Sequence, residues 1–247
     1  MDVTLSYAVR IESPKQEYLL RYLARSLASA ARQDTPCKII VVDYGSSRNY
    51  SRQIRALASY HRADQFVRVE AAEWSRGRAL NLAVRRCDTA YFAAMDADCL
   101  MDPGYITHVL GLSGERRFVM SCVRRVEGER RTYSDAMAAP AKAVHPGEGH
   151  GLICVPHAWL MKVRGYDEAY RIWGREDSDL LERARMDGMV VRQTDDTSVP
   201  QHLPHLSQKA WLDPKVVAAA KVANEKRYQE TMRLRRVVAP QGQWGCG

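Results

Sequence analysis

The first hundred residues alternate between short apolar segments and longer segments with helical periodicity. The apolar segments span residues 3–11, 37–43, 66–70 and 89–96. Helices are predicted between them, with a Ser-Pro-Lys-Gln start signal at 13–16 and helical patterns at 49–60 and 78–86. This alternation is typical of βαβ units, whose strands run parallel in one sheet. The sequence therefore predicts an α/β fold with a mostly parallel sheet.

Acidic residues stand where several of these predicted strands end. Asp43 closes the apolar run 37–43, and Asp96 and Asp98 follow the run 89–96 with one alanine between them. In open parallel sheets, ligands bind beyond the carboxyl ends of the strands. We therefore expect these three carboxylates to lie near one another at a ligand site.

The Asp96-Ala97-Asp98 segment needs a positive group nearby, because two carboxylates this close repel each other. A divalent metal that bridges to a phosphate is one solution, and hard oxygen ligands suit Mg²⁺ or Mn²⁺. The alternatives are that one aspartate caps the helix predicted near Pro103 or pairs with an arginine. The motif by itself does not decide between them.

Charge and apolar content bound the class of protein. Thirty-seven Lys and Arg against 29 Asp and Glu give a formal net charge of +8. A basic surface favours an anionic partner, such as a nucleotide, a nucleic acid or an anionic glycan or lipid, although solubility explains it equally well. No apolar run approaches a membrane span, no signal peptide is visible and no Cys-x-x-Cys pair occurs, so we expect a cytoplasmic protein without a transmembrane segment or disulfides.

The second half of the chain is less regular. Strands are predicted at 117–126 and 151–156, a helix at 176–188 with acids in its first turn, and a long helix at 214–236. Residues 127–150 are rich in Gly, Pro, Ala and His and are typical of an irregular insertion. The glycines at 147, 149 and 151 would permit a hinge for a lid.

A second motif lies in "RGYDEAYRIWGREDSDLLERARMDG" at 164–188, which combines Gly-Tyr-Asp-Glu with Trp-Gly-x-Glu-Asp at a helix start. With Asp-x-Asp upstream, the chain resembles GT-A-fold glycosyltransferases of families 2 and 7, in particular galactosyltransferase-like and chondroitin-polymerase-like catalytic domains. The resemblance spans about residues 3–210. It implies a single Rossmann-like domain with a mixed, mostly parallel central sheet flanked by helices.

The resemblance also implies how the chain divides. A catalytic domain would occupy 1–210, with a nucleotide-sugar-binding half at about 1–100 and an acceptor-binding half at about 101–210. Beyond the part that the resemblance covers, the sequence pattern predicts a C-terminal helix at 211–236 and a flexible tail at 237–247.

Residue roles follow from the same resemblance, position by position. Asp177 matches the general base, and Glu176 would orient the base or the acceptor. The residues expected at the nucleotide sugar are Arg10, Asp43, Arg78, Asn81 and Asp96. Trp173 and Gly174 would contact the acceptor. Asp98 would bind Mn²⁺ or Mg²⁺ together with Asp96 and His202, with His205 as the alternative to His202.

Two positions depart from the family pattern. Ser178 follows Glu-Asp where family 7 enzymes carry further acids, which leaves the role of Asp179 open. Tyr44 stands where many relatives have a second acid, and it could stack on the base or simply pack.

The function that this resemblance implies is an inverting, metal-dependent hexosyl- or N-acetylhexosaminyltransferase that uses a nucleotide sugar, with UDP as the expected nucleotide and a glycan as the expected acceptor. A second reading has hydroxymethylated bases of DNA as acceptor, which the net charge favours. A third is a GT-A-like binding module without catalysis, against which the intact acidic residues and His202 argue. A nucleotidyltransferase would want a glycine-rich phosphate loop after the first strand, and "RIESPKQEY" has none.

Overall fold

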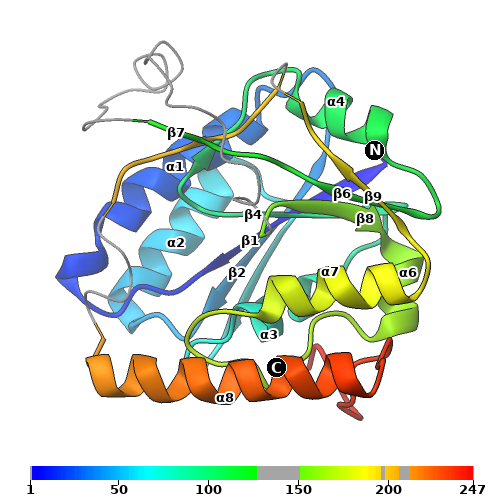
Figure 1. The fold of residues 1–247 in the computed structure, drawn as a ribbon. Helices are drawn as coiled ribbons and strands as arrows, with labels where there is room; N and C mark the ends of the chain where they lie inside the picture. Colours follow the sequence, from blue (N-terminus) through cyan, green and yellow to red (C-terminus); the bar gives the residue numbers. More distant parts are fainter. Residues whose placement is uncertain (1, 127–150, 196–197, 206–211, 247) are drawn as a thin grey trace.

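The computed structural model describes residues 2–126, 151–195, 198–205 and 212–246. Its centre is a seven-stranded sheet with helices on both faces (Figure 1). The strand order is β3 (Gln65–Val69), β2 (Lys38–Tyr44), β1 (Val3–Val9), β4 (Tyr91–Met95), β8 (Ile153–Pro156), β6 (Arg117–Met120) and β9 (Val190–Gln193). Only β8 runs antiparallel to its neighbours β4 and β6, so the predicted mixed, mostly parallel sheet is confirmed.

Alternating side chains of the central strands form two separate cores. On β2, Ile39 and Val41 join one core, whereas Ile40 and Val42 join the other. The first core is covered by α1 (Tyr18–Ala30), α2 (Arg48–Tyr60) and α4 (Tyr105–Leu112). The second is covered by α3 (Arg76–Val84), α6 (His157–Val163) and α7 (Glu176–Met186). A strand buried on both faces must be apolar throughout, which explains the continuous run at 37–43.

A small second sheet lies beside the central one. It orders β5 (Cys99–Leu100), β10 (Gln201–His202) and β7 (Arg124–Arg125). The single strand expected at 117–126 is therefore divided, because the chain leaves the main sheet after β6. At the break the backbone N–H of Cys122 donates to the Thr194 hydroxyl, which replaces a ladder hydrogen bond.

Helix starts differ slightly from the expected positions. Gln16 closes a capping box on Ser13, but the first turn is a 3₁₀ helix (Pro14–Gln16) and α1 begins at Tyr18. Helix α3 begins at Arg76, two residues earlier than predicted, because the Ser75 hydroxyl accepts a hydrogen bond from the Arg78 N–H and caps the helix. The insertion at 127–150, with its predicted hinge glycines 147 and 149, falls outside the described residues.

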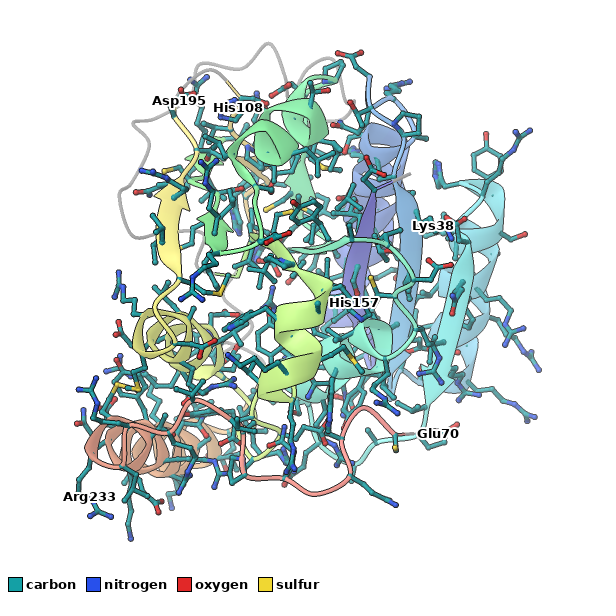
Figure 2. The ribbon with its side chains drawn as sticks, turned by 90° about the vertical axis from the view of Figure 1, so that its right-hand side faces the viewer. Lys38, Glu70, His108, His157, Asp195 and Arg233 are labelled. Atoms are coloured by element: carbon teal, nitrogen blue, oxygen red, sulfur yellow. The ribbon has the colours of Figure 1, made fainter. Side chains whose placement is uncertain are left out.

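Helix α8 (Pro214–Arg233) is the long predicted C-terminal helix, and it lies across one end of the molecule (Figure 1). Figure 2 shows α7 and α8 side by side, with Arg233 at the far end from His108 and Asp195. Among the described residues, no helix combines the length and apolarity that crossing a bilayer requires.

The segment after α8, expected to be a flexible tail, packs on the body of the protein. The Ala239 N–H donates to the Val163 carbonyl, and the Gly245 N–H donates to Glu168. Trp244 is buried in the second core and lies under the guanidinium of Arg85. A single buried aromatic side chain can anchor a segment with little other apolar content, and the expectation of a flexible tail did not take Trp244 into account.

Candidate active site

The parallel register brings the ends of β1, β2 and β4 to one edge of the sheet. Val9 lies opposite Asp43 in the β1–β2 ladder, so Arg10 directly follows at the same edge. Tyr7 of β1 pairs with Met95 of β4, and Asp96 is the next residue. Three strands therefore deliver Arg10, Asp43 and Asp96 to a common edge, as the sequence predicted for the two acids.

Asp43 and Arg10 carry hydrogen-bonding atoms that the protein itself leaves without partners. Asp43 is fully buried; its Oδ1 accepts from the Ser46 N–H, whereas Oδ2 has no hydrogen bond and lies 3.7 Å from the Arg68 guanidinium. Arg10 donates through Nη2 to Glu12 and to the Ala72 carbonyl, but its buried Nε and Nη1 donate to nothing. Unpaired buried donors and acceptors are costly in free energy, so these atoms of Asp43 and Arg10 suit a polar ligand.

Gly45 lies beside the Arg10 guanidinium in the turn after β2. Its φ is +84°, and an added Cβ would lie 2.7 Å from the Ala71 carbonyl oxygen and 3.1 Å from Arg10 Nη1. A side chain there would clash with backbone, so the turn after β2 requires glycine.

Two histidines meet Asp98. Strand β10 pairs with β5 so that His202 lies opposite Cys99, next to Asp98. The Asp98 carboxylate is 2.9 Å from His205 Nε2 and 3.8 Å from His202 Nε2. Burial alone would raise the pKa of Asp98, but the hydrogen bond from His205 and the two histidine charges together lower it. The sequence favoured His202 with His205 as its alternative, whereas the structure brings both to the same carboxylate.

This donor set fits a divalent metal ion. One oxygen of Asp98 and one nitrogen of each histidine lie within 4.8 Å of one another. Imidazole nitrogens suit transition metals better than Mg²⁺, so the set favours Mn²⁺ over Mg²⁺. Asp96 belongs to a second such group with Asp98 and Cys99, although its carboxylate is engaged elsewhere.

Arg76 is the residue that the sequence analysis missed. Its Nη1 donates to Asp177 at 2.6 Å, its Nη2 donates to Asp96 at 2.9 Å, and the same Nη2 donates to the Gly151 carbonyl at 2.7 Å. The Arg76 guanidinium thus bridges Asp96, which follows β4, and Asp177, which lies in the first turn of α7. The feature that could have identified Arg76 is its position as the first residue of α3, at the end of the helix nearest the ends of the strands.

Arg78 and Asn81, expected at the nucleotide sugar, contact other groups. Arg78 Nε lies 3.4 Å from Glu168, and its side chain is partly exposed. Asn81 is fully buried; its amide donates to the Tyr166 carbonyl and to Glu168, and its oxygen accepts from the Tyr166 N–H. The structure does not bring these two side chains together with Asp96 and Asp98, and Asn81 instead fixes the 166–168 loop.

Glu176 and Asp177 form the first turn of α7, as predicted. The helix follows a backbone with left-handed conformations at Ile172, Gly174 and Arg175. Burial and, to a smaller degree, the neighbouring negative charge of Asp177 together raise the pKa of Glu176 to about 7, against the lowering effect of Arg76. Glu176 therefore gains or loses its proton near neutral pH, although it lies at a helix N-terminus that favours the ionised form.

The raised pKa of Glu176 predicts a pH-dependent stability. A carboxyl group whose pKa is 4.5 in the unfolded chain and about 7 in the folded protein binds more protons when folded between those values. Its contribution to the free energy of unfolding is therefore full below pH 4.5 and falls as the pH rises towards 7 and above, by up to about 3 kcal/mol. Urea titrations of wild type and Glu176→Gln between pH 5 and 8 would measure this; parallel pH dependences in the two proteins would contradict it.

Asp179, whose role the sequence left open, lies inside the protein. Its carboxylate accepts from Arg183 at 2.7 Å and from the Tyr170 hydroxyl, and both charged side chains are 1% exposed. Arg183 donates further to the carbonyls of Val163, Gly165 and Val237. A buried ion pair needs such additional hydrogen bonds, and removing one partner typically costs about 3–5 kcal/mol. Asp179 thus holds α7 in place and does not face the acids of the site.

Trp173 and Gly174 precede α7 on the surface. The Trp173 side chain is 47% exposed, and the Lys221 ammonium lies 5.6 Å from its ring centre. No atom lies within 4 Å of a Cβ built on Gly174, so this glycine is required by its φ of +99° and not by space. The Trp173 indole is therefore partly exposed, with Lys221 lying against its ring. The sequence left open whether Tyr44 stacks on the nucleotide base or packs in the core. In the structure Tyr44 is buried, with its ring edge-on to Trp74.

Two sequence families match the chain. The model of glycosyl transferase family 2 matches residues 16–169, and the model described as the N-terminal domain of galactosyltransferase matches residues 141–206. No curated protein sequence matches the chain.

Solved structures share the fold at low identity. TarS of S. aureus, residues 1–349 in complex with UDP, is 16% identical with a TM-score of 0.61, over 83% of this chain and 61% of that one. GalNAc-T7 with UDP, GalNAc and Mn²⁺ is 15% identical with a TM-score of 0.63, over 84% of this chain and 44% of that one. The chain thus spans less than two thirds of the length of either relative.

The family 2 match covers more than half of the 247 residues, and both neighbouring structures share the fold over more than 80% of this chain. The chain therefore belongs to glycosyl transferase family 2, a family of transferase enzymes, and has the GT-A fold.

Proposed function

We propose that the protein is an inverting, metal-dependent glycosyltransferase that transfers a sugar from a UDP-sugar to a hydroxyl group of a glycan. The observation that carries this proposal is the position of Arg76. Its guanidinium contacts Asp96, beside the candidate metal ligands, and Asp177, the candidate base. The groups for the leaving diphosphate and for the attacking hydroxyl are therefore within reach of one side chain.

The nucleotide base would bind between Asp43 and Arg10. Asp43 Oδ2 is a buried acceptor without a hydrogen bond, and Arg10 offers two unpaired donors. Uracil presents one N–H and two carbonyl oxygens, which matches one acceptor and several donors. The structures of TarS and GalNAc-T7 with UDP support uridine as the nucleoside.

Asp98, His202 and His205 would hold the divalent metal ion. When bound, such an ion neutralises the negative charge that develops on a diphosphate leaving group. The Mn²⁺ in the GalNAc-T7 structure supports this assignment. Arg76, which donates to Asp96 at 2.9 Å, supplies a second positive charge at the same edge of the sheet.

Asp177 would act as the general base. The Arg76 guanidinium at 2.6 Å stabilises a negative charge on it, which a base needs. The acceptor hydroxyl gives its proton to Asp177 as its oxygen forms a bond to the anomeric carbon. The bond from that carbon to the diphosphate oxygen breaks on the opposite face and the electron pair leaves with UDP, so the configuration inverts. One base suffices, because the leaving group needs no proton.

A glycan acceptor is supported by Trp173. The indole lies three residues before the first residue of α7, the helix that carries Asp177, and a partly exposed indole suits stacking with a sugar ring. Among the alternatives, a binding module without catalysis is less well supported, because Glu176, Asp177 and Asp98 are all in place.

A donor panel tests the proposal. UDP-, GDP- and CMP-sugars would be offered to the wild type with Mn²⁺, with Mg²⁺ and with a chelator, and both binding and hydrolysis would be measured. We expect one UDP-sugar to be turned over with Mn²⁺ and no turnover with the chelator. If no nucleotide sugar binds with or without metal, the proposal fails.

A further inference from the structure

Helix α8 contacts the protein along one narrow stripe, and two members of that stripe, Asn224 and Thr231, are polar. Its buried residues are Val217, Asn224 and Thr231, which recur every seven residues. Asn224 is 3% exposed and stands in the middle of the helix. Burying an amide is costly unless its donors and acceptor are used, so its partners indicate why it is there.

The partners of Asn224 are all backbone groups of the segment before α7, here called the 171–175 loop. Its Nδ2 lies 2.9 Å from the Arg171 carbonyl oxygen, 3.0 Å from that of Gly174 and 3.1 Å from that of Trp173. Its Oδ1 accepts from the Arg171 N–H at 3.4 Å. One side chain from α8 therefore holds three carbonyls of a loop that lies some fifty residues earlier in the sequence.

The 171–175 loop needs external support because its backbone is strained. Ile172 has a φ of +62° and Arg175 a φ of +76°, in a region that side-chain-bearing residues rarely adopt. A β-branched residue such as isoleucine is especially unfavourable there. Strained conformations persist only where the surrounding structure over-determines them.

Other residues of α8 hold the same loop. Glu225 accepts from Arg175 Nε at 2.6 Å, and the Arg175 guanidinium lies 4.7 Å from the Tyr228 ring centre. Lys221 lies over the Trp173 ring. The contacts of α8 with the loop thus concentrate on the residues that lead directly into Glu176 and Asp177.

We infer that Asn224 is a positioning residue for the transfer reaction, which rests on the proposed function. By fixing the left-handed backbone of the 171–175 loop, it sets where the Trp173 face lies and where α7 begins, and hence the position of Asp177. Helix α8 lies beyond both family matches, which end at residues 169 and 206, so this support is a feature of this chain outside the family core.

The test compares Asn224→Asp with Thr231→Val. The first keeps the side-chain shape but replaces the donating amide with an acceptor that repels the three carbonyls. The second removes a polar group equally buried on the same stripe and one heptad away. We expect Asn224→Asp to lower kcat/KM for the acceptor at least tenfold and to leave the dissociation constant of the Mn²⁺–UDP-sugar within twofold. Thr231→Val should change neither.

Hydrogen exchange gives a readout that does not depend on activity. In Asn224→Asp, the amides of Ile172 and Trp173, which donate to the Trp74 and Arg171 carbonyls, should exchange at least tenfold faster than in wild type. Unchanged exchange in Asn224→Asp would overturn the inference, whether or not the wild type shows transferase activity. Absence of transferase activity in the wild type would instead reject the proposed function. Equal losses of donor binding and transfer would also overturn it, because they would indicate general unfolding.

If Asn224→Asp does not fold, Glu225→Gln gives a milder variant. It removes the ion pair to Arg175, which is partly exposed on both sides and is not needed for folding. We expect a two- to fivefold rise in the acceptor KM with unchanged donor binding. A wild-type acceptor KM in this folded variant would contradict the role of α8.

Discussion

Replacing Asp177 by asparagine is expected to lower the rate of sugar transfer by about 10²- to 10⁴-fold, the usual contribution of a general base. Asparagine keeps the size of the side chain and can still accept a hydrogen bond from Arg76, so the site should stay assembled. It cannot take the proton of the acceptor hydroxyl, and the reaction loses its base. Steady-state transfer rates with saturating donor and acceptor would measure the loss.

Asp187→Asn provides the matched control, since Asp187 caps the other end of the same helix and pairs with Lys162 away from the site. That variant should transfer sugar at the wild-type rate. Asp177→Asn should also bind UDP-sugar with wild-type affinity, because asparagine can still accept the hydrogen bond from Arg76. A variant that keeps more than a tenth of the wild-type rate would exclude Asp177 as the base.

Replacing Asp98 by alanine is expected to abolish metal-dependent transfer. Asp98 is the only carboxylate that both histidines approach among the described residues, so its loss leaves two imidazoles as the metal site. Removing residues that merely support metal ligands typically weakens metal binding 10- to 100-fold, so loss of a ligand should cost on the order of 100-fold or more. Calorimetric titration with Mn²⁺ in the presence of UDP would measure the affinity.

The same titration separates the histidines. His202→Ala and His205→Ala should each weaken Mn²⁺ binding, whereas His108→Ala should not, because His108 pairs with Asp195 and belongs to neither candidate metal group among the described residues. If Asp98→Ala binds Mn²⁺ as tightly as the wild type, the three residues form only an ion-paired cluster. In that case the metal site must be sought elsewhere in the chain.

The central sheet could be predicted because hydrophobic periodicity reports local structure. A continuous apolar run such as 37–43 has one stable place, a strand covered on both faces, and β2 occupies it. The break between β6 and β7 could not be predicted, because it depends on the Thr194 hydroxyl, which lies 72 residues from the Cys122 N–H that it accepts. Apolar residues continue through the break, so the pattern gives no sign of it.

The candidate site was predicted in part, for the same reason. Asp43 and Asp96 stand where apolar runs end, which a local pattern defines, and the motif that resembles the family placed Glu176 and Asp177 at a helix start. Arg76 and Arg78 stand two residues apart on one helix, and their side chains point in directions about 200° apart. The family resemblance pointed to Arg78, which faces Glu168, whereas Arg76 two positions earlier faces Asp96 and Asp177.

Contacts from α8 lay beyond any local pattern. Asn224 reaches its three carbonyl partners across 50 to 53 residues, and nothing in the sequence of α8 distinguishes a buried asparagine from an exposed one. The buried Trp244 of the tail is a similar case.

The antiparallel strand β8 marks the boundary between two parts of the sheet, which are built from early and late segments of the chain. The order β3-β2-β1-β4 uses residues 3–95 alone, with contacts between neighbouring segments, whereas β8, β6 and β9 require the chain through residue 193. During synthesis from the N-terminus, the first part can pair before the second has emerged. The ion pair between Arg76 and Asp177 then joins a late segment to an early one. On the proposed assignment, a chain stalled between these stages would hold the nucleotide-binding residues Arg10 and Asp43 in place without the base Asp177, so nucleotide binding alone would not distinguish it from the complete protein.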